Sequence, residues 1–520
     1  MDEQVPVLIV GGSLVGLTMS VLLGHHGIPH ILIERHSGTA IHPRAAAFHQ
    51  RTLETFRSVG LQEAVEQAAE REFMQDGAIM SVDTLGGREL AWFYRSVNDG
   101  VEHLSPARRI FITQIGLEPV LRARAIELGA DLRFSTELAG FEQDEAGVSA
   151  TIRSRADGTE QHIRTRYMIA ADGAHSPVRR ALGIAMGGRG DFANCATIYF
   201  RADVRPLLRD RNLSVVYVNQ PDLLAFFRFS ITGDAGFLAV FAACDAEGKR
   251  DDQLAQGLSP ERAADLVRAA LGVDADYPLA IENIQSWTAT AATADAFRQG
   301  NVFLAGDAAH LMPPTGGFGG NTGVADAHNL AWKLAMVLNG EADPALLDSY
   351  EAERRPIAQM TVEQAYRRYV ERVDPTLPAD DLASNLADTA IELGSVYGAP
   401  GTLTEAPEEP SGRPGTRLHH LWIEQDGERL STLDLAGRGF SLLVGPEGAD
   451  WIEAARAEGL DVHRIDDAAA AADLGLSGPS ALLLRPDGVI GWRTNALPAD
   501  PQSVLKEARS ALRAAEAASA

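Results

Sequence analysis

A strand, a glycine-rich turn and a helix near the start of the chain constrain its fold more than any other feature. The apolar run from Val5 to Val10 leads into Gly11-Gly12-Ser13-Leu14-Val15-Gly16, and helical spacing follows. A second apolar run, from Ile28 to Ile33, ends at Glu34 and Arg35. A dinucleotide fold needs this order, with an acid about twenty residues after the glycines to take the ribose. The pattern therefore predicts a Rossmann-like α/β domain; an ordinary βαβ unit without a ligand is the alternative.

One position in this turn departs from the dinucleotide pattern. Ser13 occupies the second glycine position, where the backbone is meant to approach a pyrophosphate. Serine is small and can donate a hydrogen bond, so the turn is still expected to bind a dinucleotide. Because Ser13 replaces this glycine, a site that binds only NAD is less expected.

A second glycine-rich block begins at Asn301. Val302 to Ala305 is a short strand that stops at Gly306 and Asp307, and a loop rich in proline and glycine leads to a helix that begins near Asn321. Glycines let backbone amides approach a flat ligand, and the helix dipole contributes about 1 kcal/mol toward a group that gains negative charge. A reduced isoalloxazine ring is such a group. The alternative is a loop whose aspartate faces solvent.

Several pieces of this block resemble a known motif. They are Asn301-Val-Phe-Leu-Ala-Gly-Asp-Ala-Ala-His310, Pro313-Pro314-Thr315-Gly316-Gly317, Gly320-Asn321, Asp326 and Asn329-Leu-Ala-Trp-Lys-Leu334. Together they resemble the second FAD motif of the class A, single-component flavoprotein aromatic hydroxylases of the p-hydroxybenzoate hydroxylase type. The likeness covers nearly the whole chain and is greatest to the anthracycline, or aklavinone-hydroxylase-like, enzymes that act on aromatic polyketides.

The resemblance implies roles for residues of this block. In the family the aspartate meets the ribityl chain of the flavin, and the proline lies near the reactive edge of the ring. The loop and helix amides meet its pyrimidine end. In this sequence these roles fall to Asp307, Pro314, Gly317, Gly320 and Asn321.

Other parts of the chain match further family positions. Arg44 matches an arginine that lies across the flavin and helps to handle pyrophosphate or NADPH, and Gln114 matches a glutamine that touches the flavin. Leu138 sits where the adenine end is usually covered, and Asp172 and Arg179 match an Asp-Gly motif associated with FAD and NADPH. The full set of expected cofactor-binding residues is Gly11, Ser13, Leu14, Val15, Gly16, Glu34, Arg35, Arg44, Gln114, Leu138, Asp172, Arg179, Gly306, Asp307, Pro314, Gly317, Gly319, Gly320 and Asn321.

No residue of the sequence is assigned to catalysis, because in this kind of enzyme the cofactor performs the chemistry. Arg44, Pro314 and Arg372 are the candidates. Arg372 lies toward the end of a long helix predicted from Ala345 to Val373, where it could face the substrate and favour a phenolate. A solvated helix end is the alternative.

The resemblance also implies a division into domains. The expected parts are a discontinuous FAD-binding domain at 1–72, 106–180 and 285–375, a middle substrate-binding domain at 73–105 and 181–284, a linker region at 376–416, and a thioredoxin-like domain at 417–520. Strands rich in phenylalanine between Ala196 and Ala289 predict a sheet that covers a flat apolar substrate, although such residues are more often core.

The C-terminal domain is expected to have four strands, at 430–435, 441–444, 462–465 and 481–493. It contains no cysteine and so lacks a CxxC motif, which excludes dithiol redox chemistry there. A role in packing or oligomerisation is expected, and the chain could be a monomer or a homodimer.

Composition excludes several classes of partner. The chain has 71 acidic and 46 basic residues and a formal charge of −25, the wrong sign for nucleic acid or an anionic membrane surface. No apolar run reaches about 18 residues, and the start Met1-Asp2-Glu3 lacks the basic region of a signal peptide, so a cytoplasmic location is expected. Two distant cysteines and 14 histidines without an HExxH pattern predict neither disulfide nor metal site.

The resemblance implies a monooxygenase that holds FAD and uses NADPH as a transient co-substrate. One atom of O2 would enter a polycyclic phenol through a flavin C4a-hydroperoxide. Three other functions remain open at this point: a Baeyer-Villiger or ring-rearranging oxygenation, a flavoprotein dehydrogenase, and a non-enzymatic protein that binds an aromatic antibiotic.

Overall fold

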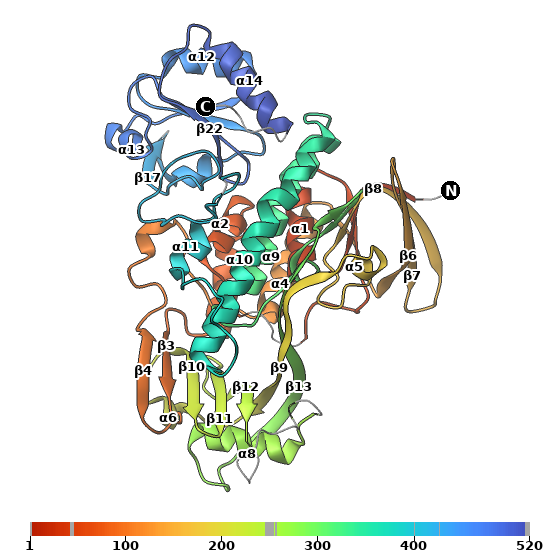
Figure 1. Ribbon diagram of the computed structural model, residues 1–520, viewed down its shortest axis with the longest axis vertical. Helices are drawn as coiled ribbons and strands as arrows, with labels where there is room; N and C mark the ends of the chain where they lie inside the picture. The colour runs from red at the N-terminus through yellow and green to blue at the C-terminus, as the bar shows by residue number, and fades with distance from the viewer. Residues whose placement is uncertain are drawn as a thin grey trace.

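The computed structural model describes residues 3–41, 46–244, 254, 257–399, 401–425 and 427–514. Figure 1 shows a blue C-terminal region at one end of the molecule and a sheet of mostly yellow and green strands at the other. The long helices α9 (Phe318–Leu338) and α10 (Asp348–Arg372) lie between them, beside another sheet, which we call the first sheet and which is formed largely by the N-terminal half of the chain. None of the described helices is long and apolar enough to cross a lipid bilayer.

The first sheet is wound in both directions from β1. Its strand order is β14-β15-β8-β1-β2-β5, and the five strands from β15 to β5 pair in parallel. Val7, Leu8 and Ile9 of β1 are fully buried, as expected for the centre of a parallel sheet with both faces covered. The Rossmann-like prediction is confirmed. The strands are β1 Glu3–Val10, β2 His30–Glu34, β5 Asp131–Phe134, β6 Thr136–Asp144, β7 Gly147–Ser154, β8 Glu160–Ala170, β14 Arg298–Gln299 and β15 Val302–Leu304.

Helices bring the glycine-rich turns of this sheet together. The helix α1 packs against α4 and α9, and α9 also packs against α2 and α10. Because α1 and α9 each follow a strand of the same sheet, their N-termini lie at the same edge. The helices of this region, besides α9 and α10, are α1 Leu14–His25, α2 Gln50–Ser58, α3 Gln62–Glu72, α4 Gln114–Glu127 and α5 Pro177–Ala181.

The second sheet has two chemically different faces. Its strand order is β16-β13-β9-β12-β11-β10-β3-β4. One face packs its aliphatic and phenylalanine side chains under α8, and the other meets Tyr369 of α10 and Val373, the residue that follows this helix. Its elements are β3 Ala78–Val82, β4 Glu89–Tyr94, β9 Met186–Arg201, α6 Arg205–Leu208, β10 Leu213–Gln220, β11 Leu223–Phe229, β12 Ala235–Ala243, α8 Pro260–Leu271, β13 Ala280–Ala294 and β16 His310–Leu311.

The C-terminal region has a thioredoxin-like sheet of order β20-β19-β21-β22. The first two strands are parallel and the others antiparallel. The strand expected at 430–435 is wrong beyond Ser431, where β18 ends, because a capping box of Ser431 and Asp434 starts a 3-10 turn at Thr432. The run 481–493 is two strands. The elements are β17 Trp422–Gln425, β18 Glu428–Ser431, β19 Ser441–Val444, α12 Ala449–Ala457, β20 Asp461–Arg464, α13 Ala468–Asp473, β21 Ala481–Leu484, β22 Ile490–Thr494 and α14 Pro501–Arg513.

Buried ion pairs join the C-terminal region to the helices of the first sheet. Arg485 donates to Glu353 of α10 at 2.7 and 2.9 Å, and Arg417 pairs with the buried Glu54 of α2. The segment 376–416, expected to be a linker, contains the helix α11 (Asp388–Leu393), and Val396 bridges to Thr416. This segment therefore packs as part of the fold.

Candidate active site

The turn between β1 and α1 is lined by backbone. Gly11 has a φ of +109°, and a Cβ there would collide with the carbonyl oxygen of Ala171 at the end of β8. A Cβ on Gly16 would collide with the carbonyl oxygen of Gly11. Side chains are therefore excluded from both positions. The first amides of α1 have no acceptor within the helix, so together with the helix dipole they can bind a pyrophosphate.

Ser13 fits the turn without strain. It is the N-cap of α1, with an extended φ of −95° that any residue adopts. Its hydroxyl donates to a carboxylate oxygen of Glu118 at 2.6 Å, and the side-chain amide of Gln114 approaches that hydroxyl at 3.3 Å. Leu14 and Val15 follow in the first turn of the helix. The departure from the glycine pattern is thus explained by backbone geometry.

Glu118 is a buried acid of this site that the sequence analysis missed. It is 0% exposed, and its second oxygen accepts the amide of Ala40 at 2.7 Å. Burial raises the pKa of Glu118, and hydrogen bonds from Ser13 and backbone amides oppose that rise. The available signal was its position beside Leu117 and Leu121, which form the buried stripe of α4.

Glu34 and Arg35 at the end of β2 point in different directions. The carboxylate of Glu34 accepts the Gly12 amide at 2.7 Å and the His36 amide at 2.8 Å. Arg35 is exposed, and its guanidinium approaches the His36 ring at 3.2 Å. The structure therefore brings Glu34, but not Arg35, into the β1–α1 turn.

The two glycine-rich motifs meet at Val15. A Cβ on Gly306, which has a φ of +61°, would lie 2.7 Å from the Val15 side chain. A Cβ on Gly323 would meet the same side chain. The absence of side chains at both glycines lets the start of α1 approach the start of α9 closely. We call the surface formed by these two helix N-termini and their turns the glycine cradle.

The start of α9 is fixed by a side chain rather than by a ligand. Gly317, the N-cap of α9, has a φ of +70°. The side-chain oxygen of Asn321 accepts the His49 amide at 2.9 Å and the Thr52 hydroxyl at 2.7 Å. Its amide donates to the carbonyls of Gly317 and Ala47 at 2.7 and 3.0 Å. Asn321 therefore holds α2 against α9 and leaves only backbone amides to meet a flavin. Arg44 lies outside the described residues.

Three polar side chains complete the cradle. Among the described residues, Gln114 Oε1 and Asp172 Oδ1 are buried without a hydrogen-bond partner. Burial raises the pKa of Asp172, and hydrogen bonds from Ser176 and from the Val178 amide, which donates to Oδ2, oppose that rise. Arg179 donates to the carbonyls of Ala308 and Ala174, which ties the Asp-Gly turn to the Gly306 turn. Unpaired buried oxygens are costly, so those of Gln114 and Asp172 fit a site that a polar ligand completes.

The remaining expected cofactor residues lie in more open positions. Asp307 is exposed in the 3-10 turn Gly306–Ala308, and Pro314 is exposed on the loop before Gly317. Leu138 of β6 is half-buried against the core of the first sheet. A Cβ on Gly319 would only touch Met312, at 3.6 Å, and Gly320 is half-buried in the first turn of α9. The cradle as a whole fits FAD, since its backbone amides suit a pyrophosphate, and its two orphaned oxygens can accept hydrogen bonds from hydroxyl or N–H groups of the cofactor.

An aromatic wall covers the face of the second sheet that meets α10. Neighbouring rings are 5.4–6.2 Å apart between centroids, in tilted or edge-on contact. Phe93 is 40% exposed and Tyr199, Phe226 and Phe237 are half-buried, so this face of the sheet is only partly covered. Such a surface suits a flat aromatic ligand. The rings of the aromatic wall are Phe93, Tyr199, Tyr217, Phe226, Phe237, Phe241, Trp287 and Tyr369, the last at 5.4 Å from Phe241.

Arg372, the last residue of α10, lies at one end of the wall. Its guanidinium stands over the Phe93 ring at 5.6 Å and bonds to the hydroxyl of Tyr217. Burial raises the pKa of Tyr217, and the charge and hydrogen bond of Arg372 partly offset that rise. The side chain of Arg372 is half-buried. The structure thus places this cation beside the aromatic wall and not at a solvated helix end.

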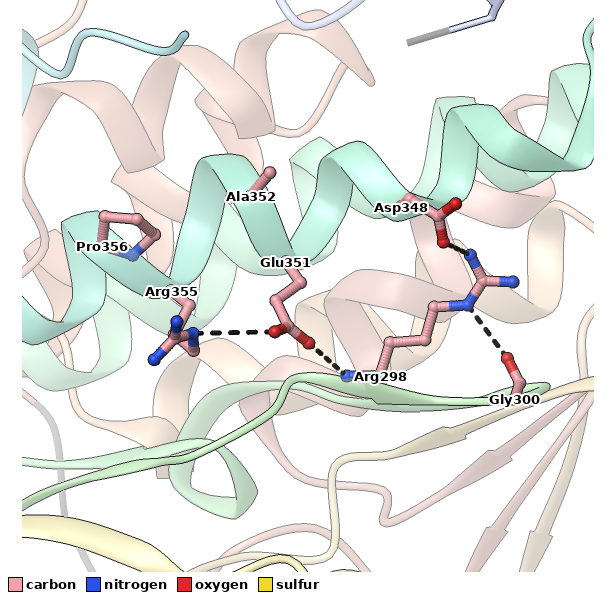
Figure 2. Close-up of a pocket in the computed structure, with 7 residues that line it drawn as sticks. All are labelled: Arg298, Gly300, Asp348, Glu351, Ala352, Arg355 and Pro356. Carbon is pink, nitrogen blue, oxygen red and sulfur yellow. Dashed lines mark hydrogen bonds and ion pairs between the residues drawn. The ribbon is translucent and has the colours of Figure 1, made fainter. Parts of the chain in front are cut away.

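A separate open cavity of about 560 Å³ runs along α10 and β14. Figure 2 shows Arg298 bonded to Asp348 and to the Gly300 carbonyl, and Glu351 paired with Arg355. Its charged groups are already paired, and none of the expected cofactor residues lines it. We regard it as an open depression apart from the glycine cradle. In the part of the chain that the structure describes, no group of three or more His, Cys, Asp or Glu residues is arranged to hold a metal ion.

Comparisons with known proteins agree with this geometry. The family model described as "FAD binding domain" matches residues 4–365, and "Aromatic-ring hydroxylase, C-terminal" matches residues 411–515. A 4-methyl-5-nitrocatechol 5-monooxygenase from a Burkholderia species is 46% identical over 98% of both chains. A tetracenomycin B2 monooxygenase-dioxygenase from Streptomyces olivaceus is 40% identical over 96% of this chain and 97% of the relative. The solved complex of aklavinone-11 hydroxylase with FAD and aklavinone has a TM-score of 0.92 at 33% identity and covers 99% of both chains.

Proposed function

Because the chain belongs to the family of FAD-binding aromatic-ring hydroxylases and is a flavin-dependent monooxygenase, we propose that it hydroxylates an electron-rich polycyclic phenol of polyketide type with NADPH and O2. One observation carries the choice of substrate class. The aromatic wall spans strands from β4 to β13 and ends at Arg372, which is the arrangement that a long planar phenol would fill.

The residues of the chain have separable tasks in this reaction. Bound FAD supplies the electron transfer from NADPH and the activation of O2. The amides of α1 and α9 hold the cofactor, and those of α9 favour negative charge on the reduced ring. The aromatic wall orients the substrate and keeps water away from the reacting carbon. Arg372 favours the phenolate form, which makes the substrate ring more electron-rich.

A smaller substrate is the second candidate. The relative from Burkholderia is named for a nitrocatechol, a single ring, and its identity to this chain is 46%. A single ring would cover only part of the aromatic wall. Baeyer-Villiger oxygenation of a polyketide on the same scaffold gives a product of different connectivity, and a protein that only binds an aromatic antibiotic would not oxidise NADPH.

The test is to measure NADPH oxidation, O2 consumption and product mass with three substrates: a tetracyclic phenol, 4-methyl-5-nitrocatechol and phenol itself. The proposal expects yellow protein that adds one oxygen atom to the tetracyclic phenol with the highest kcat/KM. A preference for the nitrocatechol would select the second candidate. Colourless protein that does not take up FAD would overturn both.

We infer a domain division of 1–72, 106–180 and 285–375 against 73–105 and 181–284. The two sheets support it, except that β13 crosses the boundary at 285 and β16 pairs with the second sheet. Arg44 is proposed to handle NADPH. The acidic charge and the two cysteines, which form no disulfide, favour a cytoplasmic protein, as a monomer or homodimer.

A further inference from the structure

The helix α11, between the second sheet and the C-terminal region, contacts both halves of the active site. Its residues Ala390 to Leu393 are buried. Asp388 and Glu392 are one helical turn apart, and their side chains are only 19% and 4% exposed. Buried carboxylates need hydrogen-bond or ion-pair partners. The partners of Asp388 differ from those of Glu392.

Asp388 faces the substrate side. The hydroxyl of Tyr94, on β4, donates to it at 2.7 Å, and the guanidinium of Arg368, on α10, bonds to its other oxygen at 2.6 and 3.0 Å. Burial would raise the pKa of Asp388, but Arg368, the Tyr94 hydrogen bond and the charge of Arg372 hold it below its ordinary value. Burial and the neighbouring carboxylate raise the pKa of Tyr94 to about 12. The edge strand of the aromatic wall is thus tied to an ionised aspartate.

Glu392 faces the flavin side. Arg109 donates to one of its oxygens at 2.9 Å, and Nε2 of His49 lies 3.8 Å from the other. The same Nε2 is 3.1 Å from the carbonyl oxygen of Gly316, in the glycine loop before α9. Burial lowers the pKa of His49 despite the nearby carboxylate, so the neutral ring can donate Nε2–H to that carbonyl. The carboxylate of Glu392 therefore lies 3.8 Å from the ring nitrogen that contacts the loop before α9, although its own hydrogen bond comes from Arg109.

Phe318 links the two contacts. It is the first residue of α9, and it packs in one cluster with Ile391 of α11 and Ala365 of α10. Arg368 stands over its ring at 5.3 Å, and the His49 ring meets it edge-on at 5.4 Å. The partners of both acids thus converge on the residue at which the flavin-binding helix begins.

We propose that α11 is a bracket between the two parts of the active site. It sets the position of the loop before α9, which contains Gly316, relative to the aromatic wall. Asp388 is the positioning residue for the substrate side, through Tyr94 and Arg368, and Glu392 is the positioning residue for the flavin side, through His49. This inference rests on the proposed function. Its consequence is that α11 controls how much of the NADPH consumed appears as hydroxylated product and how much as H2O2, because oxygen transfer needs the ring held in place.

The substrate arm of the test is Asp388→Asn in the FAD-loaded enzyme. The amide keeps the shape of the side chain but removes its charge from Arg368 and Tyr94. We expect the KM for the phenol to rise about tenfold and the product formed per NADPH to fall, with FAD affinity within about twofold of wild type. Asp381→Asn is the matched control, since Asp381 is an exposed acid that pairs with Arg189 at the surface.

The flavin arm is Glu392→Gln. We expect the Kd for FAD to rise about tenfold and the visible absorption bands of the bound flavin to change without any substrate present, while the KM for the phenol stays within about twofold. Glu371→Gln is the matched control, because Glu371 pairs with Arg367 on the exposed side of α10. Melting temperatures at saturating FAD show whether each variant is folded.

The bracket is supported if Asp388→Asn changes mainly the KM for the phenol and Glu392→Gln changes mainly the Kd for FAD. If both variants lose FAD and substrate affinity to the same extent, α11 only stabilises the fold and the proposal is overturned. The proposal is also overturned if both variants have the same KM for the phenol and the same Kd for FAD as their control variants. If wild-type enzyme hydroxylates no phenol, the proposed function fails, but FAD affinity and the change in flavin absorption on adding an aromatic ligand still decide the role of α11.

Discussion

The glycine cradle and the aromatic wall bind their ligands by different means. The cradle is made of backbone, held open by Gly11, Gly16 and Gly306, where a Cβ would collide with neighbouring atoms. The wall is made of side chains from separate strands, such as Phe93 and Phe237. A backbone site depends on chain geometry and tolerates little change, whereas a side-chain surface can change one residue at a time. The fold can therefore keep one cofactor and vary its substrate.

The two faces of β11 give the largest expected effect. Phe227 is 0% exposed and packs under α8, whereas its neighbour Phe226 is half-buried in the aromatic wall. Phe227→Ala should lower the free energy of unfolding by about 3–5 kcal/mol, because it leaves a cavity in the core. Phe226→Ala should be less destabilising but should raise the KM for the phenol several-fold. Urea denaturation measures the free energy of unfolding and steady-state kinetics measures the KM. If the two variants were equally destabilised and the KM did not change, the aromatic wall would be ordinary hydrophobic core.

The cradle should tolerate much less. In Gly16→Ala the new Cβ would meet the carbonyl oxygen of Gly11, which cannot move without opening the turn. We expect the Kd for FAD to rise at least about a hundredfold, or ~2.7 kcal/mol. Gly38→Ala is the control, since no atom lies within 4 Å of a Cβ there. Equilibrium dialysis of FAD measures the change, and a Gly16 variant that retains FAD like the control would show that the turn does not contact the cofactor.

Arg372 separates substrate binding from cofactor binding. Arg372→Ala removes the cation beside Tyr217 and Phe93, so we expect kcat/KM for a phenol to fall about tenfold to a hundredfold, with FAD content unchanged. Lysine at this position should restore part of the activity because it keeps the charge. The control is Arg355→Ala, because the Arg355 side chain pairs with Glu351 of the same helix and is 40% exposed. A loss of FAD with unchanged kcat/KM would show that Arg372 contributes to cofactor binding and not to substrate binding.

The smallest expected effect concerns the titration of the cradle. Burial raises the pKa of Glu118 above the ordinary carboxyl value of 4.5. The protonated side chain therefore stabilises the folded state fully below pH 4.5, and this stabilisation is lost as the pH rises through the pKa of the folded state. Glu118→Gln should therefore gain in stability relative to wild type as the pH rises above about 4.5. Melting temperatures across this range measure the difference, and a difference that does not vary with pH would contradict the assignment.

The same contrast explains what could be predicted from the sequence. The β1–α1 turn and the Gly306 turn were predictable because glycine spacing reports backbone geometry directly. The parallel sheet followed from apolar runs that alternate with helical spacing. Which phenylalanines face α10 could not be predicted, since Phe226 and Phe227 are neighbours in a continuous apolar run and only the pleat of the placed strand separates them.

Residues whose role depends on distant partners were missed. Glu118 contacts Ser13 and Ala40 only after α4 has packed beside α1. The segment 376–416 was expected to be a linker region, with prolines and glycines concentrated at 398–416. The buried partners of its residues Asp388 and Glu392 lie on four other segments, which the local composition does not show. Likewise, the strand expected at 430–435 ignored the competing local hydrogen bonds of Ser431 and Asp434.

The most direct test of the central claim is a turnover experiment with heavy-oxygen-labelled O2, in which FAD-loaded protein, NADPH and a polycyclic phenol are combined and the product is analysed by mass spectrometry. If the glycine cradle holds FAD beside a substrate bound on the aromatic wall, one labelled oxygen atom will appear in the phenol for each turnover, and no product will form without FAD. Oxidation of NADPH that yields only H2O2 with every aromatic substrate, or labelled product from protein without flavin, would contradict this account.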